Sequence, residues 1–120
     1  MSGSLTRADK LLCATYAGIA LVALFATWSH NLAFFQQPDN GGLPSFIAAA
    51  YANPAAASIS NDILFYLLAG WLFMVVEARR LGIKHVWVYL ALSGLIAISV
   101  MFPLFLITRQ AALARRRARP

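Results

Sequence analysis

Residues 11–35 read LLCATYAGIALVALFATWSHNLAFF, a run of 25 residues without a charged side chain. As a helix rising about 1.5 Å per residue, this run extends about 37 Å, enough to cross a hydrocarbon core of about 30 Å with some tilt. Arg7 and Lys10 precede it, as in a signal peptide. However, the run is longer than the roughly 7–15 apolar residues of a signal peptide, and no Ala-x-Ala site closes it. We therefore expect a retained first transmembrane helix.

The composition of the whole chain also indicates a membrane protein. Of the 120 residues, 61% are hydrophobic, against about 45–50% in soluble chains. Ten residues are basic and four are acidic, which gives a net charge of +6. These values exclude a disordered chain, a collagen, a disulfide scaffold and most soluble folds. We expect residues 1–120 to form one all-α membrane domain.

Metal and nucleic-acid binding are not expected from this sequence. The single cysteine, Cys13, permits no intrachain disulfide and cannot complete a zinc site with only His30 and His85. The basic residues gather at predicted membrane edges and form no stripe interleaved with aromatic residues, which nucleic-acid surfaces carry. We expect no metal and no cofactor, with a bound lipid or isoprenoid as the small molecule to consider.

A turn and a short helix are predicted to follow the first span. Residues 36–42 (QQPDNGG) are rich in turn-forming residues and predict a turn at the membrane surface. Pro44 can open a short interfacial helix over residues 44–52. Asn53 is then a favourable N-cap and Pro54 suits the first helical position, so the next long helix is expected to begin there.

The second transmembrane helix is expected at residues 54–80. Its charge-free part, residues 63–76, extends only about 21 Å, which is shorter than a span needs. Either the helix sits shallow in the membrane, or Asp62 or Glu77 enters the hydrocarbon.

A third transmembrane helix is expected at residues 86–108, which carry no charge. The second helix can end at Gly82 in a left-handed cap, with Arg79 and Arg80 near its negative dipole end. A turn through Lys84 and His85 is so short that the third helix must return antiparallel.

Pro103 lies inside this predicted third helix. Because proline has no N–H, it leaves the carbonyl of Ser99 free and is expected to kink the helix. Residues 109–120 follow as a basic tail that we expect to rest on anionic lipid headgroups.

The predicted topology leaves the membrane orientation open. With three single crossings, five cations precede the spans or lie in the turn near Lys84, and the other five lie in the tail on the opposite side. The positive-inside rule therefore gives no bias by count. The cations on the N-terminal side sit closer to helix ends, which favours a cytoplasmic N-terminus and an external C-terminus. Insertion in both orientations, with an antiparallel dimer, is the alternative.

Asp62 is the first candidate for a functional residue. In a helix beginning at Pro54 it lies two turns in, where an ionised carboxylate costs about 2.5–3.5 kcal/mol and needs a polar partner. His30, Asn31 and Ser99 are expected in the same leaflet and could complete a polar cluster that binds a ligand or handles protons. Alternatively, the cluster only joins the helices, or the helix starts near residue 60 and Asp62 is an exposed first-turn residue.

Glu77 is the other acid expected near the membrane. It lies fifteen residues from Asp62, on the order of 22 Å along a helix, which excludes a two-carboxylate catalytic pair. Arg80 follows by three residues on the same face, so a structural ion pair is expected, to which Lys10 could add.

The chain resembles the uncharacterised bacterial family called domain of unknown function 2834, over about residues 11–109. The resemblance rests on Tyr51-Ala52-Asn53-Pro54-Ala55, Asp62, Glu77-Ala78-Arg79-Arg80-Leu81-Gly82 and Phe102-Pro103-Leu104-Phe105-Leu106. It implies a small protein with membrane helices and no established activity. The Asn53-Pro54 start and Asp62 are also similar to small membrane proteins of carotenoid and terpenoid pathways, which implies an isoprenoid-like ligand.

Two classes of function follow for a multi-pass protein of the bacterial cytoplasmic (inner) membrane. The first is a non-enzymatic accessory, assembly or structural component of a membrane complex or homo-oligomer, favoured because three helices leave little room for an enclosed pocket. The second is a binder, isomerase or cyclase for an isoprenoid-like ligand, with Asp62 as acid and His30 beside it. A proton-coupled transporter is less favoured, because no inverted repeat is present.

Overall fold

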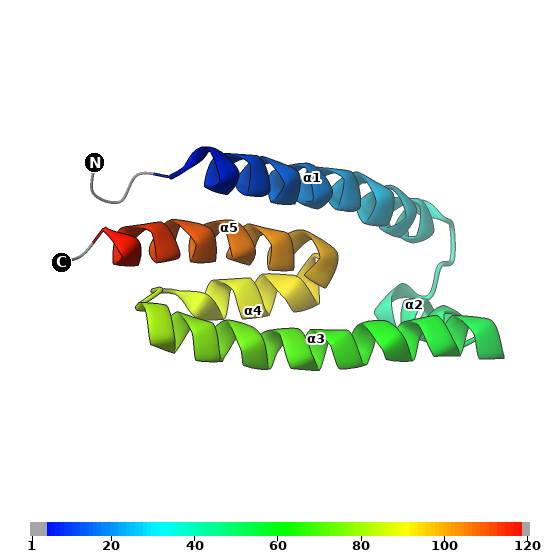
Figure 1. Ribbon diagram of the computed structural model, residues 1–120. Coiled ribbons are helices and arrows are strands. Elements are labelled where there is room, and N and C mark those ends of the chain that lie inside the picture. The colour runs from blue at the N-terminus through cyan, green and yellow to red at the C-terminus, as the bar shows by residue number, and fades with distance from the viewer. Residues whose placement is uncertain (1–4, 119–120) are drawn as a thin grey trace.

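The computed structural model describes residues 5–118, and its helices confirm the all-α fold class (Figure 1). In chain order they are α1 (Arg7–Gln36), α2 (Gly42–Ala50), α3 (Pro54–Leu81), α4 (Val86–Leu95) and α5 (Ile98–Arg117). No strand occurs within residues 5–118. The helices α1, α3 and α5 are long and apolar enough to cross a membrane, so the number of such helices is the one that the sequence predicts.

The helix α1 begins a turn before the uncharged run because Thr6 and Asp9 form a capping box. The Thr6 hydroxyl accepts a hydrogen bond from the backbone N–H of Asp9 (3.1 Å), and the Asp9 carboxylate accepts one from the N–H of Thr6 (2.8 Å). This arrangement pairs two backbone donors that a helix start otherwise leaves free.

The short helix predicted before the second span is present as α2, beginning two residues earlier than expected. The Asn53 side chain accepts a hydrogen bond from the N–H of Ala56 (2.8 Å), and Pro54 is the first residue of α3. Asp62 is therefore two turns inside α3. The alternative start near residue 60 is wrong, because the Asn53 cap already satisfies the helix start at Pro54.

The third span is not the continuous helix predicted at residues 86–108. The chain leaves the helical path at Ile96 and Ala97, where Ala97 is fully extended (φ −178°, ψ 141°). The N–H of Val100, which would bond to Ile96 in a continuous helix, instead donates to Ala97 O (3.2 Å). The Trp28 indole N–H of α1 donates to the freed carbonyl of Ile96 (3.0 Å).

Pro103 is not the point of interruption. It lies in the second turn of α5, which continues through it to Arg117. The break falls instead just after Ser93 and Gly94, and glycine costs about 1 kcal/mol in a helix interior relative to alanine. The Trp71 indole of α3 donates to Ser93 Oγ (2.6 Å), so contacts from two other helices hold the end of α4.

After this break α5 runs back along α4, and the two form a helical hairpin between α1 and α3 (Figure 1). Phe105 of α5 and Met74 of α3 are fully buried in the core beside the hairpin. The third apolar helix is therefore Ile98–Arg117, and the tail expected at residues 109–120 is helical through Arg117. Arg119 lies outside the described residues.

The hairpin returns α5 to the end of the molecule where α1 begins. There Gln110 donates to Asp9 (2.7 Å), and Arg109 pairs with Glu77 of α3 (2.5 Å). The expected division into five cations on opposite sides is wrong, because α5 turns back and places its arginines beside the start of α1 and the end of α3. The cations of the described residues all lie at this end, which we call the basic end: Arg7, Lys10, Arg79, Arg80, Lys84, Arg109, Arg115, Arg116 and Arg117.

Candidate functional site

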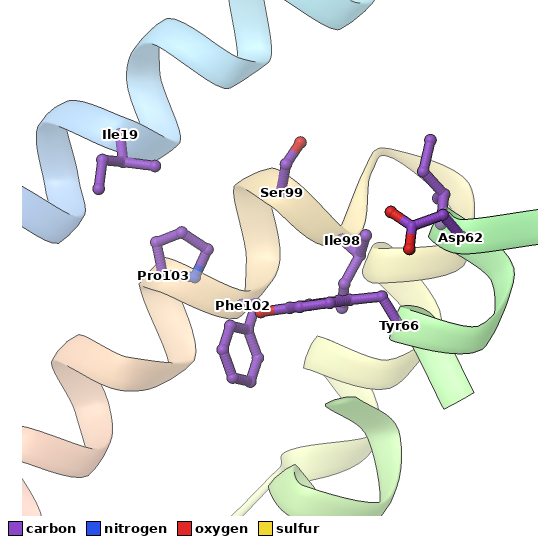
Figure 2. A pocket seen from close by; sticks show the side chains of 8 residues that line it. Ile19, Asp62, Tyr66, Ile98, Ser99, Phe102 and Pro103 are labelled. Carbon is purple, nitrogen blue, oxygen red and sulfur yellow. The ribbon is translucent and has the colours of Figure 1, made fainter. Parts of the chain in front are cut away.

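A cavity of about 330 Å³ lies between α1, α3 and the first turns of α5 (Figure 2). We call it the Asp62 cavity. Its position follows from the fold, because the hairpin break places the start of α5 beside the N-terminal half of α3. The residues that line it are Ile19, Asp62, Ile63, Tyr66, Ile98, Ser99, Phe102 and Pro103.

Asp62 is the charged side chain among the residues that line this cavity. Figure 2 shows its carboxylate turned from α3 toward the start of α5, where Ser99 and Pro103 lie. It precedes Arg79 of the basic end by seventeen residues, about 25 Å along a helix. A hydrocarbon layer of about 30 Å that begins near Arg79 therefore contains Asp62.

The Asp62 carboxylate is exposed, and no side chain of residues 5–118 hydrogen-bonds to it. Its polar neighbours are otherwise engaged. Asn61 accepts a hydrogen bond from Tyr51 (2.9 Å), and Ser60 donates to the carbonyl of Ala50 at the end of α2 (2.7 Å). The N-terminal turn of α5, toward which the carboxylate points, carries the positive end of a helix dipole and favours the anion.

Ser99 and Pro103 form the wall of the cavity opposite Asp62 (Figure 2). Because Pro103 has no N–H, the Ser99 carbonyl has no helical donor four residues ahead. The rest of the lining is apolar, and Tyr66 packs edge-to-face on Phe102 with ring centroids 5.8 Å apart. A carboxylate and a hydroxyl in an otherwise apolar pocket suit an amphiphilic molecule that donates hydrogen bonds.

The predicted cluster of four polar residues is only partly assembled. Asp62 and Ser99 line the same cavity, but His30 and Asn31 are not among its lining residues. Trp28 already lies level with the tip of the hairpin through its bond to Ile96 O, so His30 and Asn31 lie beyond that tip, near the end of α1. The sequence could not reveal this separation, because depth along two helices does not show whether they pack together, and α1 packs on α5 rather than on α3.

The Glu77 carboxylate is buried at the basic end and pairs with two arginines. Arg80 donates from Nε to Glu77 Oε1 (2.9 Å), and Arg109 of α5 donates from Nε to Oε2 (2.5 Å). The spacing of Glu77 and Arg80 on one helix predicts the first contact. The second comes from α5 rather than from Lys10. Gly82 ends α3 with φ +70°, a left-handed conformation that glycine adopts without strain.

Asp9 is a buried acid that the sequence analysis did not single out. Its carboxylate accepts hydrogen bonds from Gln110 (2.7 Å) and from Arg117 (2.5 Å), which ties the start of α1 to the end of α5. The Thr6-x-x-Asp9 spacing is a detectable capping signal. No sequence signal indicates the partners from α5. Within residues 5–118, no group of three or more His, Cys, Asp or Glu side chains could hold a metal ion.

The fold has three helices long and apolar enough to cross a membrane, which fits a small helical membrane protein. Residues 15–111, about four fifths of the chain, match the family described as Protein of unknown function DUF2834. The chain belongs to this family, which confirms the resemblance carried by the motifs around Asn53, Glu77 and Pro103. No curated protein and no solved structure matches the chain.

Proposed function

We propose that this chain is a non-enzymatic accessory or assembly subunit of a membrane complex, whose partner contacts α3 at Asp62. The observation that supports this function is the exposed carboxylate of Asp62, two turns inside an apolar helix. Its transfer into hydrocarbon costs about 2.5–3.5 kcal/mol, which a hydrogen-bond donor on a partner would offset. A second copy of this chain is one such partner.

The distribution of burial is consistent with a partner on the outer helices. In the most apolar windows of α1 and α3, 6% and 11% of the residues are buried, against 33% in α5. The central helix α5 thus already has its neighbours, whereas α1 and α3 present apolar faces to lipid or to other helices. Association at those faces would rely on packing and interhelical hydrogen bonds, because lipid removes the hydrophobic gain.

The test is purification of the intact protein from its native membrane in a mild detergent, with the mass of the particle measured. We expect a complex larger than one chain, and we expect Asp62→Asn to lower its recovery at least about tenfold. Asp39→Asn is the matched control, because Asp39 is an exposed acid in the turn after α1. A single-chain particle for the unmodified protein, or equal recovery for both variants, would overturn this function.

The Asp62 cavity supports a second candidate, the binding of an isoprenoid-like amphiphile. Its volume of about 330 Å³ and its apolar lining fit part of a hydrocarbon chain, with a hydroxyl group toward Asp62 and Ser99. Isomerase or cyclase chemistry has less support, because His30 does not line the cavity. Solvent extraction of the purified protein and mass spectrometry should then find one such compound, and Ser99→Phe should deplete it. Extraction of only bulk membrane lipid would exclude this candidate.

We also propose that the protein is a multi-pass component of a bacterial cytoplasmic membrane. The cations of the described residues lie at one end, and lysine and arginine concentrate in the cytoplasmic parts of membrane proteins. The basic end would then face the cytoplasm, and α2 would lie at the opposite surface.

A further inference from the structure

A second hollow lies at the basic end, between the C-terminal turns of α3 and α5. It measures about 350 Å³ and is lined by Arg79, Arg80, Leu81, Gly82, Arg115 and Arg116. We call it the arginine cleft. Its four guanidinium groups are exposed and come from two helices that meet only because the α4–α5 hairpin turns back. We propose that the arginine cleft binds the phosphate group of an anionic membrane lipid.

The charge balance at this end favours an anion. The two carboxylates, Asp9 and Glu77, are buried and held by Arg117, Arg109 and Arg80. By contrast, Arg79 and Arg115 have no carboxylate partner within residues 5–118. Guanidinium groups crowded in one cleft repel one another, and a phosphate relieves that repulsion while accepting paired N–H bonds from each planar fork.

One arginine of the cleft also has a structural role. Arg116 donates to the backbone carbonyl of Arg80 (2.9 Å), which satisfies one of the free carbonyls at the end of α3. This bond fixes the mouth of the cleft by joining α5 to α3. Among residues 5–118, Arg79 and Arg115 still have no carboxylate partner, so helix capping alone does not account for the cleft.

The depth of the cleft favours a lipid headgroup over a soluble phosphate. The charge-free part of α3 ends at Val76, and Arg79 and Arg80 follow within about 6 Å of helix. The headgroup layer on each side of the hydrocarbon core is about 5–8 Å thick. Leu72 and Val76 precede Arg80 at helical spacing on one face of α3 and are 67% and 54% exposed. They would contact the acyl chains of a lipid whose phosphate lies in the cleft.

The test compares the full chain with Arg79→Gln/Arg115→Gln in detergent, with binding followed as a rise in Tm. The probes are short-chain phosphatidylglycerol, short-chain phosphatidylcholine, glycerol phosphate and inorganic phosphate. The matched control is Arg7→Gln/Lys84→Gln, which removes the same charge from the basic end but outside the lining of the cleft. Arg79→Lys/Arg115→Lys keeps the positive charge and removes only the paired N–H donors of the guanidinium groups. It replaces the glutamine variant in this comparison if that variant does not fold.

We expect phosphatidylglycerol to bind the unmodified chain at least about tenfold more tightly than phosphatidylcholine. Loss of two cations near a membrane surface should weaken this binding about tenfold to thirtyfold in the cleft variant. The control should lose less than about threefold, and the lysine variant should lie between the two. Equal losses of phosphatidylglycerol binding in the cleft variant and the control would overturn the site, because they would indicate non-specific electrostatic attraction to the whole basic end. Equal stabilisation by glycerol phosphate or inorganic phosphate would overturn its assignment to a lipid.

Discussion

The four acidic residues of this chain differ in what balances their charge. Asp9 and Glu77 are buried at the basic end and accept hydrogen bonds from arginines of α5. Asp39 lies exposed in the turn after α1. Asp62 alone faces an apolar cavity between helices, which makes its carboxylate the residue whose partner matters most for function.

Removal of the Glu77 charge should destabilise the protein. In Glu77→Gln the side chain keeps its shape, but Arg80 and Arg109 lose their shared anion. Hydrogen bonds to charged groups contribute about 1.5–3 kcal/mol, so we expect a loss of that order in the free energy of unfolding. Thermal unfolding in detergent measures it, with Asp39→Asn as the control. A Tm equal to that of the control would show that this ion pair contributes nothing to stability.

At the scale of the elements, the break between α4 and α5 could not be predicted from the sequence, whereas the two ends of α3 could. Residues 86–108 are uncharged, and such a run fits one membrane helix as well as two half-helices that turn back. The turned-back arrangement is held by two indole N–H groups: Trp28 of α1 donates to Ile96 O, and Trp71 of α3 donates to Ser93 Oγ. By contrast, α3 begins at Pro54 and ends at Gly82 because its capping signals are local in the chain.

Loss of the Trp28 indole N–H should weaken the hairpin break. In Trp28→Phe the carbonyl of Ile96 loses its donor in an apolar setting, and an unsatisfied polar group of this kind costs about 1–3 kcal/mol. We expect a lower Tm and more hydrogen exchange at residues 95–100. Trp87→Phe is the control, since Trp87 is 65% exposed. Unchanged stability and exchange in Trp28→Phe would argue against this bond as the cause of the break.

Across the whole molecule, the hairpin decides where the charge lies. The molecule measures 59 × 24 × 24 Å, and its long axis exceeds the hydrocarbon core of about 30 Å. If the long axis crosses the membrane, the molecule is therefore longer than the hydrocarbon core, and its two ends differ in charge. Because α5 returns to the start of α1, the earlier preference for an external C-terminus does not hold within this fold.

Both chain ends are therefore expected in the cytoplasm. Green fluorescent protein fused to either terminus should fluoresce, and alkaline phosphatase fused to either should be inactive, since the first folds in the cytoplasm and the second outside it. This result follows from the positive-inside rule applied to a single basic end. A fluorescent N-terminal fusion together with an active C-terminal phosphatase fusion would show that residues 86–108 cross the membrane once and would refute the hairpin. Active phosphatase at both termini would keep the hairpin and refute the cytoplasmic placement. Activity of both reporters at one terminus would indicate dual insertion.

Residue order alone was enough to establish the helical membrane class, the family, the caps at Asn53 and Gly82, and the pair of Glu77 and Arg80. These depend on apolar run length and on contacts within a few residues. The break at Ile96, the Asp62 cavity, the arginine cleft and the grouping of cations depend on contacts between helices far apart in the chain. An uncharged helical segment is stable in the hydrocarbon core whether it crosses the membrane or turns back. Only its packing against neighbouring helices decides between these two arrangements.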